Sequence, residues 1–125
     1  MRFNDDKKNL LQSWGITIQT PYNANILYES ERGLGNDGER IVKLYSENFE
    51  YKVECAEYYK VIELDKDMEI ISEIIKRGKI EDVININNIR IIDSIKRDNI
   101  NDYYKYLIIT FDYNKKIYYI FERII

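Results

Sequence analysis

The strongest periodic pattern in the chain predicts an amphipathic helix over about residues 65–77. Its apolar positions recur at intervals of three and four residues, as along one face of an α-helix: Ile70, Ile71, Ile74 and Ile75. Asp65 or Asp67 suits the N-cap, and the basic pair Lys76-Arg77 suits the negative end of the helix dipole. Gly78 is typical of the residue at which a helix ends.

The C-terminal part carries the strongest strand pattern. Two runs rich in Tyr, Ile and Phe, Tyr104–Tyr113 and Lys116–Arg123, are separated by Asn114-Lys115, which suits a tight turn. The first run has apolar residues on both faces: Leu107, Ile109 and Phe111 on one, Tyr106 and Ile108 on the other. We therefore expect this hairpin in the centre of a sheet.

Four further segments have the composition or alternation of strands: Ile16–Ile18, Ile26–Glu29, Glu39–Tyr45 and Arg90–Ile95. Pro21 and Asn23–Asn25 predict a turn, and Gly33–Gly38 predicts a hairpin loop. Phe49–Ala56 is ambiguous between helix and strand because its apolar residues alternate but also share a helical face. Ser46, as a candidate N-cap, favours the helix there.

These elements predict an α+β fold. A mainly antiparallel sheet of about five to six strands carries the central helix over about 65–77 and one or two short helices, one of them at the N-terminus between Asn4 or Asp5 and Gly15. With 125 residues, a second core would leave each half too short to bury enough apolar surface. We therefore expect residues 1–125 to form a single domain.

The composition is that of a globular protein, with 45% hydrophobic and 33% charged residues and a net charge of -3. Cys55 is the single cysteine, so an internal disulfide is excluded and a reducing, cytoplasmic location is favoured. The longest apolar runs, such as Leu107–Ile109, are far shorter than the roughly 18 residues of a membrane span. The bias toward Ile, Asn, Lys and Tyr is typical of an AT-rich genome, and we expect a bacterial or phage origin.

The chain has no histidine, which removes the usual general base, the commonest metal ligand and every Ser-His or Cys-His nucleophile pair. We therefore expect a binding protein without catalytic residues, cofactor or metal, although carboxylate chemistry stays open. Asp65 and Asp67 offer oxygen ligands for a hard cation, but helix capping explains them better. Cys55 lacks a partner that would activate it and suits an apolar core.

The segment Gly33–Gly38 matches the pattern G-x-G-x-x-G of dinucleotide-binding loops. A strand-like segment follows it, whereas that site needs a helix N-terminus, so a structural loop is favoured. A ligand-binding loop is the alternative, and its candidate residues are Gly33, Gly35, Asp37, Gly38 and Glu39. In the structural interpretation Glu39 faces solvent beside the turn.

Charge is unevenly distributed along the chain. Tyr45–Glu73 contains nine acidic residues and three lysines, a net charge of -6, whereas Ile74–Ile125 has a net charge of +3. An acidic surface attracts a basic protein and repels nucleic acid, although a merely solvated helix face also explains the pattern. Tyrosine doublets in strands place one ring outward, where it suits an interface. The candidate partner-binding residues are Glu50, Glu54, Glu57, Tyr58, Tyr59 and Glu63.

The order of elements also resembles a protein family. It comprises a glycine loop ending in Asp37-Gly38-Glu39, the segment Val61–Leu64 leading into a helix, and Thr110–Tyr113 closing a hairpin on Ile117–Tyr119. This order resembles small uncharacterised bacterial α+β proteins, some of which are similar to immunity proteins of toxin systems. The resemblance implies inhibition of a toxin or nuclease by direct protein contact, with no cofactor and no catalytic residue.

Two other functions stay open. A phage-encoded antagonist of a host defence protein would share the acidic character. A small-ligand or metal-binding domain, or a carboxylate-based enzyme, would use the Gly33–Gly38 loop. A homodimer is a further alternative, since the Ile-rich C-terminal strand would invite pairing if it lay at a sheet edge.

Overall fold

The structure is a computed structural model that describes residues 11, 14–30, 38–54, 57–100 and 103–125. The elements are, in chain order, β1 (Ile16–Ile18), β2 (Asn23–Glu29), β3 (Gly38–Tyr45), β4 (Tyr51–Val53), β5 (Tyr58–Lys60), α2 (Leu64–Gly78), the 3-10 turn η1 (Ile86–Asn88), β6 (Ile89–Ile100), β7 (Tyr103–Asp112) and β8 (Ile117–Ile124). The predicted α+β class is confirmed. None of the helices in these ranges has the length and apolarity needed to cross a membrane.

Six strands form an antiparallel sheet in the order β2-β3-β8-β7-β6-β5, and β1 pairs with β4 in a separate two-stranded sheet. The hairpin of β7 and β8 therefore lies in the centre of the large sheet, as its two apolar faces predict. The condition for a homodimer paired through the C-terminal strand is not met, because β8 pairs with β3 on one side and β7 on the other. The two edges are β2 and β5.

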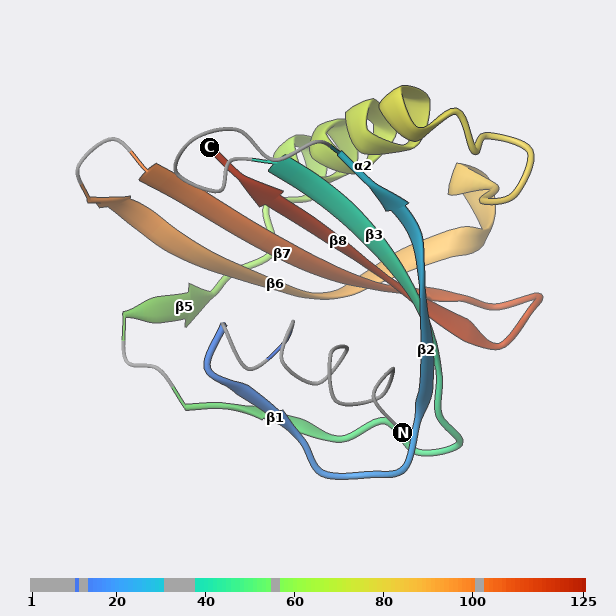
Figure 1. The fold of residues 1–125 in the computed structure, drawn as a ribbon, viewed down its shortest axis with the longest axis horizontal. Helices are drawn as coiled ribbons and strands as arrows, with labels where there is room; N and C mark the ends of the chain where they lie inside the picture. Colours follow the sequence, from blue (N-terminus) through green and yellow to red (C-terminus); the bar gives the residue numbers. More distant parts are fainter. Residues whose placement is uncertain (1–10, 12–13, 31–37, 55–56, 101–102) are drawn as a thin grey trace.

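Both faces of the large sheet are covered (Figure 1). Helix α2 lies across one face, and the β1–β4 pair lies against the other. The core on the helix side contains the four isoleucines of α2 together with side chains of β3, β6, β7 and β8, among them Ile41, Ile91, Ile108 and Phe121. The opposite core contains Trp14, Ile16, Leu44, Leu107 and Ile120. Alternate residues of the central strands therefore enter different cores, which explains why these strands read as apolar throughout.

Helix α2 buries the predicted stripe of isoleucines, but its first turn differs from the prediction. The N-cap is Glu63, and neither Asp65 nor Asp67 occupies that position. Instead, the fully buried Asp67 reaches back, and its Oδ2 accepts the backbone N–H of Glu63 at 3.0 Å. Gly78 is the last helical residue, and Lys79 takes the left-handed conformation that ends the helix, with φ 56°.

Two local predictions between β1 and β5 are wrong. The expected turn at Asn23–Asn25 is the beginning of β2, because its pairing with β3 extends to Tyr45. The helix favoured for Phe49–Ala56 is instead strand β4, which pairs with β1. The hydroxyl of Ser46 does not cap a helix but donates to the carbonyl of Pro21 at 2.8 Å. Alternation, rather than the candidate cap, was the decisive signal in this segment.

Several predictions fall largely on residues outside the described ranges. These are the short N-terminal helix, the Gly33–Gly38 loop up to Asp37, and the burial of Cys55. The antiparallel pairing of β2 with β3 nevertheless confirms that a hairpin connection spans the glycine loop.

Gly78 packs where a larger residue does not fit. A Cβ atom at this position would lie 2.9 Å from Cγ of Tyr28, close to the rigid base of that side chain. Helix propensity alone predicts that Gly78→Ala stabilises by about 1 kcal/mol. We expect Gly78→Ala to destabilise instead. The overpacking against Tyr28 costs about 1–3 kcal/mol, which exceeds the gain in helix propensity and leaves a net loss of about 1 kcal/mol.

The free energy of unfolding from urea denaturation measures this effect. Tyr28→Ala supplies the matched background, because it removes the ring that the added methyl would meet. In that background Gly78→Ala should stabilise, as propensity predicts. The same sign of change in both backgrounds would show that the contact with Tyr28 does not decide the outcome.

Candidate functional site

The segment from β5 to the start of α2 exposes an unusual amount of apolar surface. Four large side chains within six residues are more than two-fifths exposed, and we call them the apolar ridge: Tyr59 (41%), Val61 (42%), Ile62 (47%) and Leu64 (63%). The other large exposed apolar side chains in the described ranges are spread along the chain. Clustered apolar exposure of this kind marks interaction surfaces more often than isolated exposed residues do.

The edge position of β5 leaves backbone groups of the ridge facing solvent. The N–H of Val61 donates to the carbonyl of Ser94 at 3.0 Å, and Tyr59 is in register with Lys96. Since pairing alternates along an antiparallel ladder, Tyr59 and Val61 direct backbone groups toward β6, whereas Lys60 directs its own outward. The ridge therefore combines apolar side chains with a short strand edge to which no other described strand pairs.

A buried lysine holds the ridge against α2. The ammonium of Lys96, whose residue is 1% exposed, donates to the carbonyl of Val61 at 3.1 Å and to Oε1 of Glu63 at 2.6 Å. Its Nζ also lies 3.1 Å from Oδ1 of Asp67, in an ionic contact and not an aligned hydrogen bond. The hydrogen bond from Lys96 and its positive charge lower the pKa of Glu63. Sequence reasoning missed Lys96, although a lysine directly after the predicted strand Arg90–Ile95 was a usable signal.

The structure separates the predicted partner-binding residues into two groups. Tyr59 is exposed, and Glu57 and Glu63 lie near it in sequence at the same edge, paired with Arg97 at 2.9 Å and with Lys96 respectively. Tyr58 is turned toward the core, where its ring lies 5.2 Å from that of Trp14 and its hydroxyl receives a hydrogen bond from Lys105.

Glu50 and Glu54, the other predicted residues, flank β4 in the small sheet. Both are exposed. Oε2 of Glu54 accepts a hydrogen bond from the hydroxyl of Thr17 at 2.9 Å, and the backbone N–H of Glu50 donates to Oγ1 of Thr20 at 3.1 Å. These two carboxylates therefore lie on the layer below the large sheet, whereas the ridge lies at its edge.

Much of the acidic charge in Tyr45–Glu73 is neutralised within the molecule. Four of its nine acids contact cations from the later part of the chain: Glu57 with Arg97, Glu63 and Asp67 with Lys96, and Glu73 with Arg77 and Arg123. The remaining five have no ion pair to a described residue: Glu47, Glu50, Glu54, Asp65 and Glu69. The acidic surface is therefore smaller than the sequence count indicates.

Glu39 does not face solvent, contrary to the prediction. It is 8% exposed, and its carboxylate accepts hydrogen bonds from Nε and Nη2 of Arg77, each at 2.7 Å, and from Nε of Arg123 at 2.9 Å. Burial alone would raise the pKa of Glu39, but these bonds and the two positive charges lower it below its ordinary value. The carboxylate of Glu39 therefore stabilises the fold by joining Arg77 to Arg123. Of the other candidate loop residues, Gly38 begins β3, and Gly33, Gly35 and Asp37 lie outside the described ranges.

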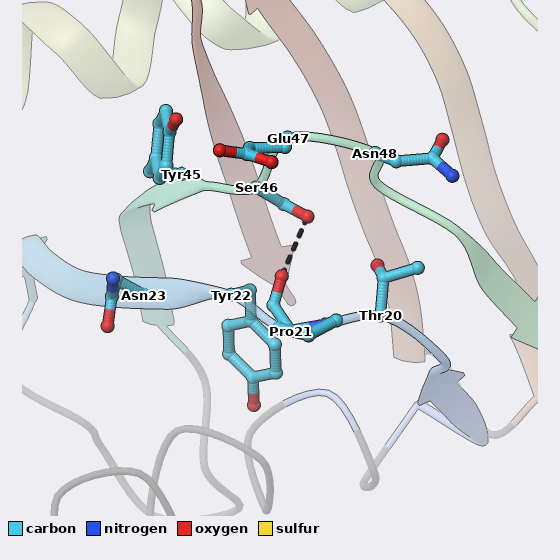
Figure 2. A pocket seen from close by; sticks show the side chains of 8 residues that line it. All are labelled: Thr20, Pro21, Tyr22, Asn23, Tyr45, Ser46, Glu47 and Asn48. Carbon is cyan, nitrogen blue, oxygen red and sulfur yellow. Dashed lines mark hydrogen bonds between the residues drawn. The ribbon is translucent and has the colours of Figure 1, made fainter.

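A groove opens between the residues before β2 and those after β3 (Figure 2). Its volume is about 520 Å³, and its lining comes from Thr20–Asn23 and Tyr45–Asn48. The hydrogen bond from Ser46 to the carbonyl of Pro21 joins the two walls. Within the described ranges, no group of three acidic or cysteine residues is arranged to hold a metal ion.

Comparisons of the chain with family models, curated proteins and solved structures found no match. The resemblance to immunity proteins therefore stays a prediction from the sequence, and the function has to be inferred from the geometry of the ridge and the groove.

Proposed function

We propose that the protein inhibits another protein by direct contact, in the manner of an immunity protein, and that its partner is a basic toxin or nuclease. The observation that carries this proposal is the apolar ridge, which places four exposed apolar side chains beside an edge of β5 that pairs with no other described strand. Tyrosine anchors protein interfaces because it buries much area with few rotamers, and apolar side chains around such an anchor exclude water from it. The inhibitor needs no cofactor.

The free edge supports a defined mode of contact. A partner strand can pair with the outward backbone groups of Lys60 while its side chains pack on Tyr59 and Val61. Main-chain hydrogen bonds then contribute affinity, and the alternating side chains contribute specificity. The strand β5 is only three residues long, so the edge stays too short to invite indiscriminate pairing.

The charges around the ridge favour a basic partner. Asp65 and Glu69 of α2 are exposed, without an ion pair to a described residue. Of the neighbouring lysines, Lys60 lies 3.7 Å from Asp93, which offsets its charge, whereas Lys66 lies over the ring of Tyr106 at 5.2 Å and keeps its charge. The two carboxylates Asp65 and Glu69 outnumber the single charge of Lys66, and this local excess of negative charge attracts a positively charged surface.

A matched pair of substitutions tests the ridge. Val61 and Val83 are both valines with nearly equal exposure, 42% and 41%, but Val83 lies between α2 and η1, away from the ridge in sequence. Once a partner is captured from the source organism and purified, calorimetry with wild type, Val61→Asp and Val83→Asp measures its affinity. We expect Val61→Asp to weaken binding about 30-fold, as loss of an anchor worth about 2 kcal/mol requires, and Val83→Asp to leave binding unchanged.

The inhibitory part has its own measurement. Wild-type protein at saturating concentration should suppress the activity of the partner, and Val61→Asp should restore it in proportion to the lost affinity. Equal binding by the two valine variants would overturn the ridge as the contact surface. A partner that stays fully active when it is saturated with the wild-type protein would overturn the proposal that this protein is an inhibitor. Charge reversal is best confined to Asp65 and Glu69, because a lysine at Glu63 would lie against the buried Lys96.

A further inference from the structure

The groove shown in Figure 2 has the size of a ligand site. Its volume of about 520 Å³ falls within the range of about 300–1,000 Å³ that is usual for small-molecule pockets. Its eight lining residues belong to two adjacent segments, Thr20–Asn23 and Tyr45–Asn48, held together by the Ser46–Pro21 hydrogen bond at 2.8 Å. The two walls are therefore fixed relative to each other before any ligand arrives.

The polar groups of the groove favour a hydrogen-bond donor as ligand. The hydroxyl proton of Ser46 is committed to the carbonyl of Pro21, so its oxygen offers only acceptor capacity to a ligand. The carboxylate of Glu47 is also an acceptor alone when ionised, whereas the amides of Asn23 and Asn48 each offer both a carbonyl oxygen and N–H donors. The groups that can only accept, Ser46 and Glu47, therefore favour N–H donors on the part of a ligand that lies against them.

The charge and the aromatic surface of the groove favour a planar cation. None of the eight lining residues is a lysine or arginine, and Glu47 supplies a negative charge. The ring of Tyr45 is available, since this residue is 46% exposed, and the Glu47 side chain points toward it in Figure 2. A cation between a tyrosine face and a carboxylate gains a cation–π contact and an ion pair at once.

We propose that this groove binds the guanidinium group of an arginine side chain or of a small arginine-like molecule. Guanidinium is planar, carries five N–H donors and stacks on aromatic rings, whereas the ammonium of lysine is a compact, strongly hydrated charge. Anionic ligands such as phosphates are repelled by Glu47 and find no cation in the lining. If the guanidinium belongs to an arginine side chain of the basic partner, the proposal rests on the proposed function. Binding of a small arginine-like molecule does not depend on that function.

NMR titration of the full chain tests the groove without any partner. The probes are blocked arginine (N-acetyl-L-arginine methylamide) and the citrulline analogue, which has nearly the same shape but no charge. We expect chemical-shift changes centred on the amides of 20–23 and 45–48, and about three- to fivefold tighter binding of the arginine probe, in keeping with an exposed cation–π contact or ion pair. Equal binding of both probes, or changes centred elsewhere, would overturn the proposal.

Variants assign the contributions of the two side chains. Glu47→Gln and Tyr45→Ala should each weaken binding of the arginine probe about three- to fivefold, whereas Tyr45→Phe should retain binding because it keeps the ring face. Both residues are exposed, so these variants should fold, and retained amide dispersion verifies it. Unchanged affinity in Glu47→Gln and Tyr45→Ala would overturn the assignment of the cation to this groove.

A comparison with free L-arginine identifies the source of the group. Tighter binding of the free amino acid than of the blocked probe indicates a small metabolite, and tighter or equal binding of the blocked probe indicates a protein side chain; both outcomes support the guanidinium site. Failure of the ridge experiment leaves these titrations unaffected. The proposed function and the groove are therefore tested separately.

Discussion

Replacing Lys96 by alanine is expected to lower the free energy of unfolding by about 3–5 kcal/mol, the cost of breaking a buried ion pair by removing one partner. Lys96 is 1% exposed and Asp67 is fully buried, so water cannot replace the lost ammonium. The variant leaves the Asp67 charge without its cation beneath the first turn of α2. The carbonyl of Val61 loses its donor as well.

The chain provides its own probe for this measurement. Trp14 is the only tryptophan and is completely buried, so its fluorescence follows urea denaturation. The control is the double variant Lys96→Met with Asp67→Asn, which removes both charges but keeps an oxygen that can accept the N–H of Glu63. It should lie within about 1–2 kcal/mol of wild type. A loss below about 1 kcal/mol in Lys96→Ala would mean that the site is hydrated and that the pair contributes no more than a surface ion pair.

The second large effect is expected at Glu39, where substitution by glutamine should cost about 2–3 kcal/mol at neutral pH because hydrogen bonds to charged groups are lost. The carboxylate joins Arg77 of α2 to Arg123 of β8, with three donor–acceptor distances between 2.7 and 2.9 Å. Glutamine keeps the volume but provides one acceptor oxygen and no charge. The matched control is Glu29→Gln, since the Glu29 side chain is 42% exposed and its pair with Arg40 should contribute less than about 1 kcal/mol.

The pH dependence of this effect follows from the lowered pKa of Glu39. Burial opposes ionisation of the carboxyl, but the hydrogen bonds from Arg77 and Arg123 outweigh it and hold the pKa below the ordinary value of 4.5. A carboxyl with a lower pKa in the folded state stabilises fully above the unfolded value, and this contribution disappears as the pH falls through the folded pKa. The stability gap between wild type and Glu39→Gln should therefore be largest at pH 6–7 and shrink as the pH falls below 4.5. A constant gap over that range would contradict the role of the ionised carboxylate.

Local patterns predicted the elements that depend on local information. The isoleucine stripe of α2 and the two runs of the β7–β8 hairpin are visible within short windows of sequence, and the apolar faces of β7 placed it centrally. The error at β4 arose where a local cap signal at Ser46 competed with alternation. The hydroxyl of Ser46 instead satisfies a carbonyl 25 residues away, which no local pattern encodes.

The candidate site was harder to predict because its determinants are distant in sequence. Lys96 meets Glu63 across 33 residues, and Arg123 meets Glu39 across 84. The cations that neutralise these two carboxylates were therefore not visible near them in sequence. As a result, the net acidic charge around Glu63 and the exposure of Glu39 were both predicted too high. The sequence shows that the ridge residues are apolar, but it does not show that they are exposed. Apolar side chains are usually buried, and these side chains are exposed because β5 lies at the edge of the sheet. The partner-binding role of Glu50, Glu54, Glu57, Tyr58, Tyr59 and Glu63 stays a prediction.

The strand order also dictates a sequence of events during synthesis. The centre of the sheet is completed by β8, the last strand in chain order, whose residues pair with β3 from Gly38 opposite Ile124 to Leu44 opposite Tyr118. While β8 is still inside the ribosome, the β2–β3 hairpin and the later strands β5, β6 and β7 are two unconnected half-sheets, each with an open edge. Such long-range pairing folds slowly. Until β8 emerges, β3 and β7 therefore each expose an unpaired edge, and a chaperone would matter most in that interval.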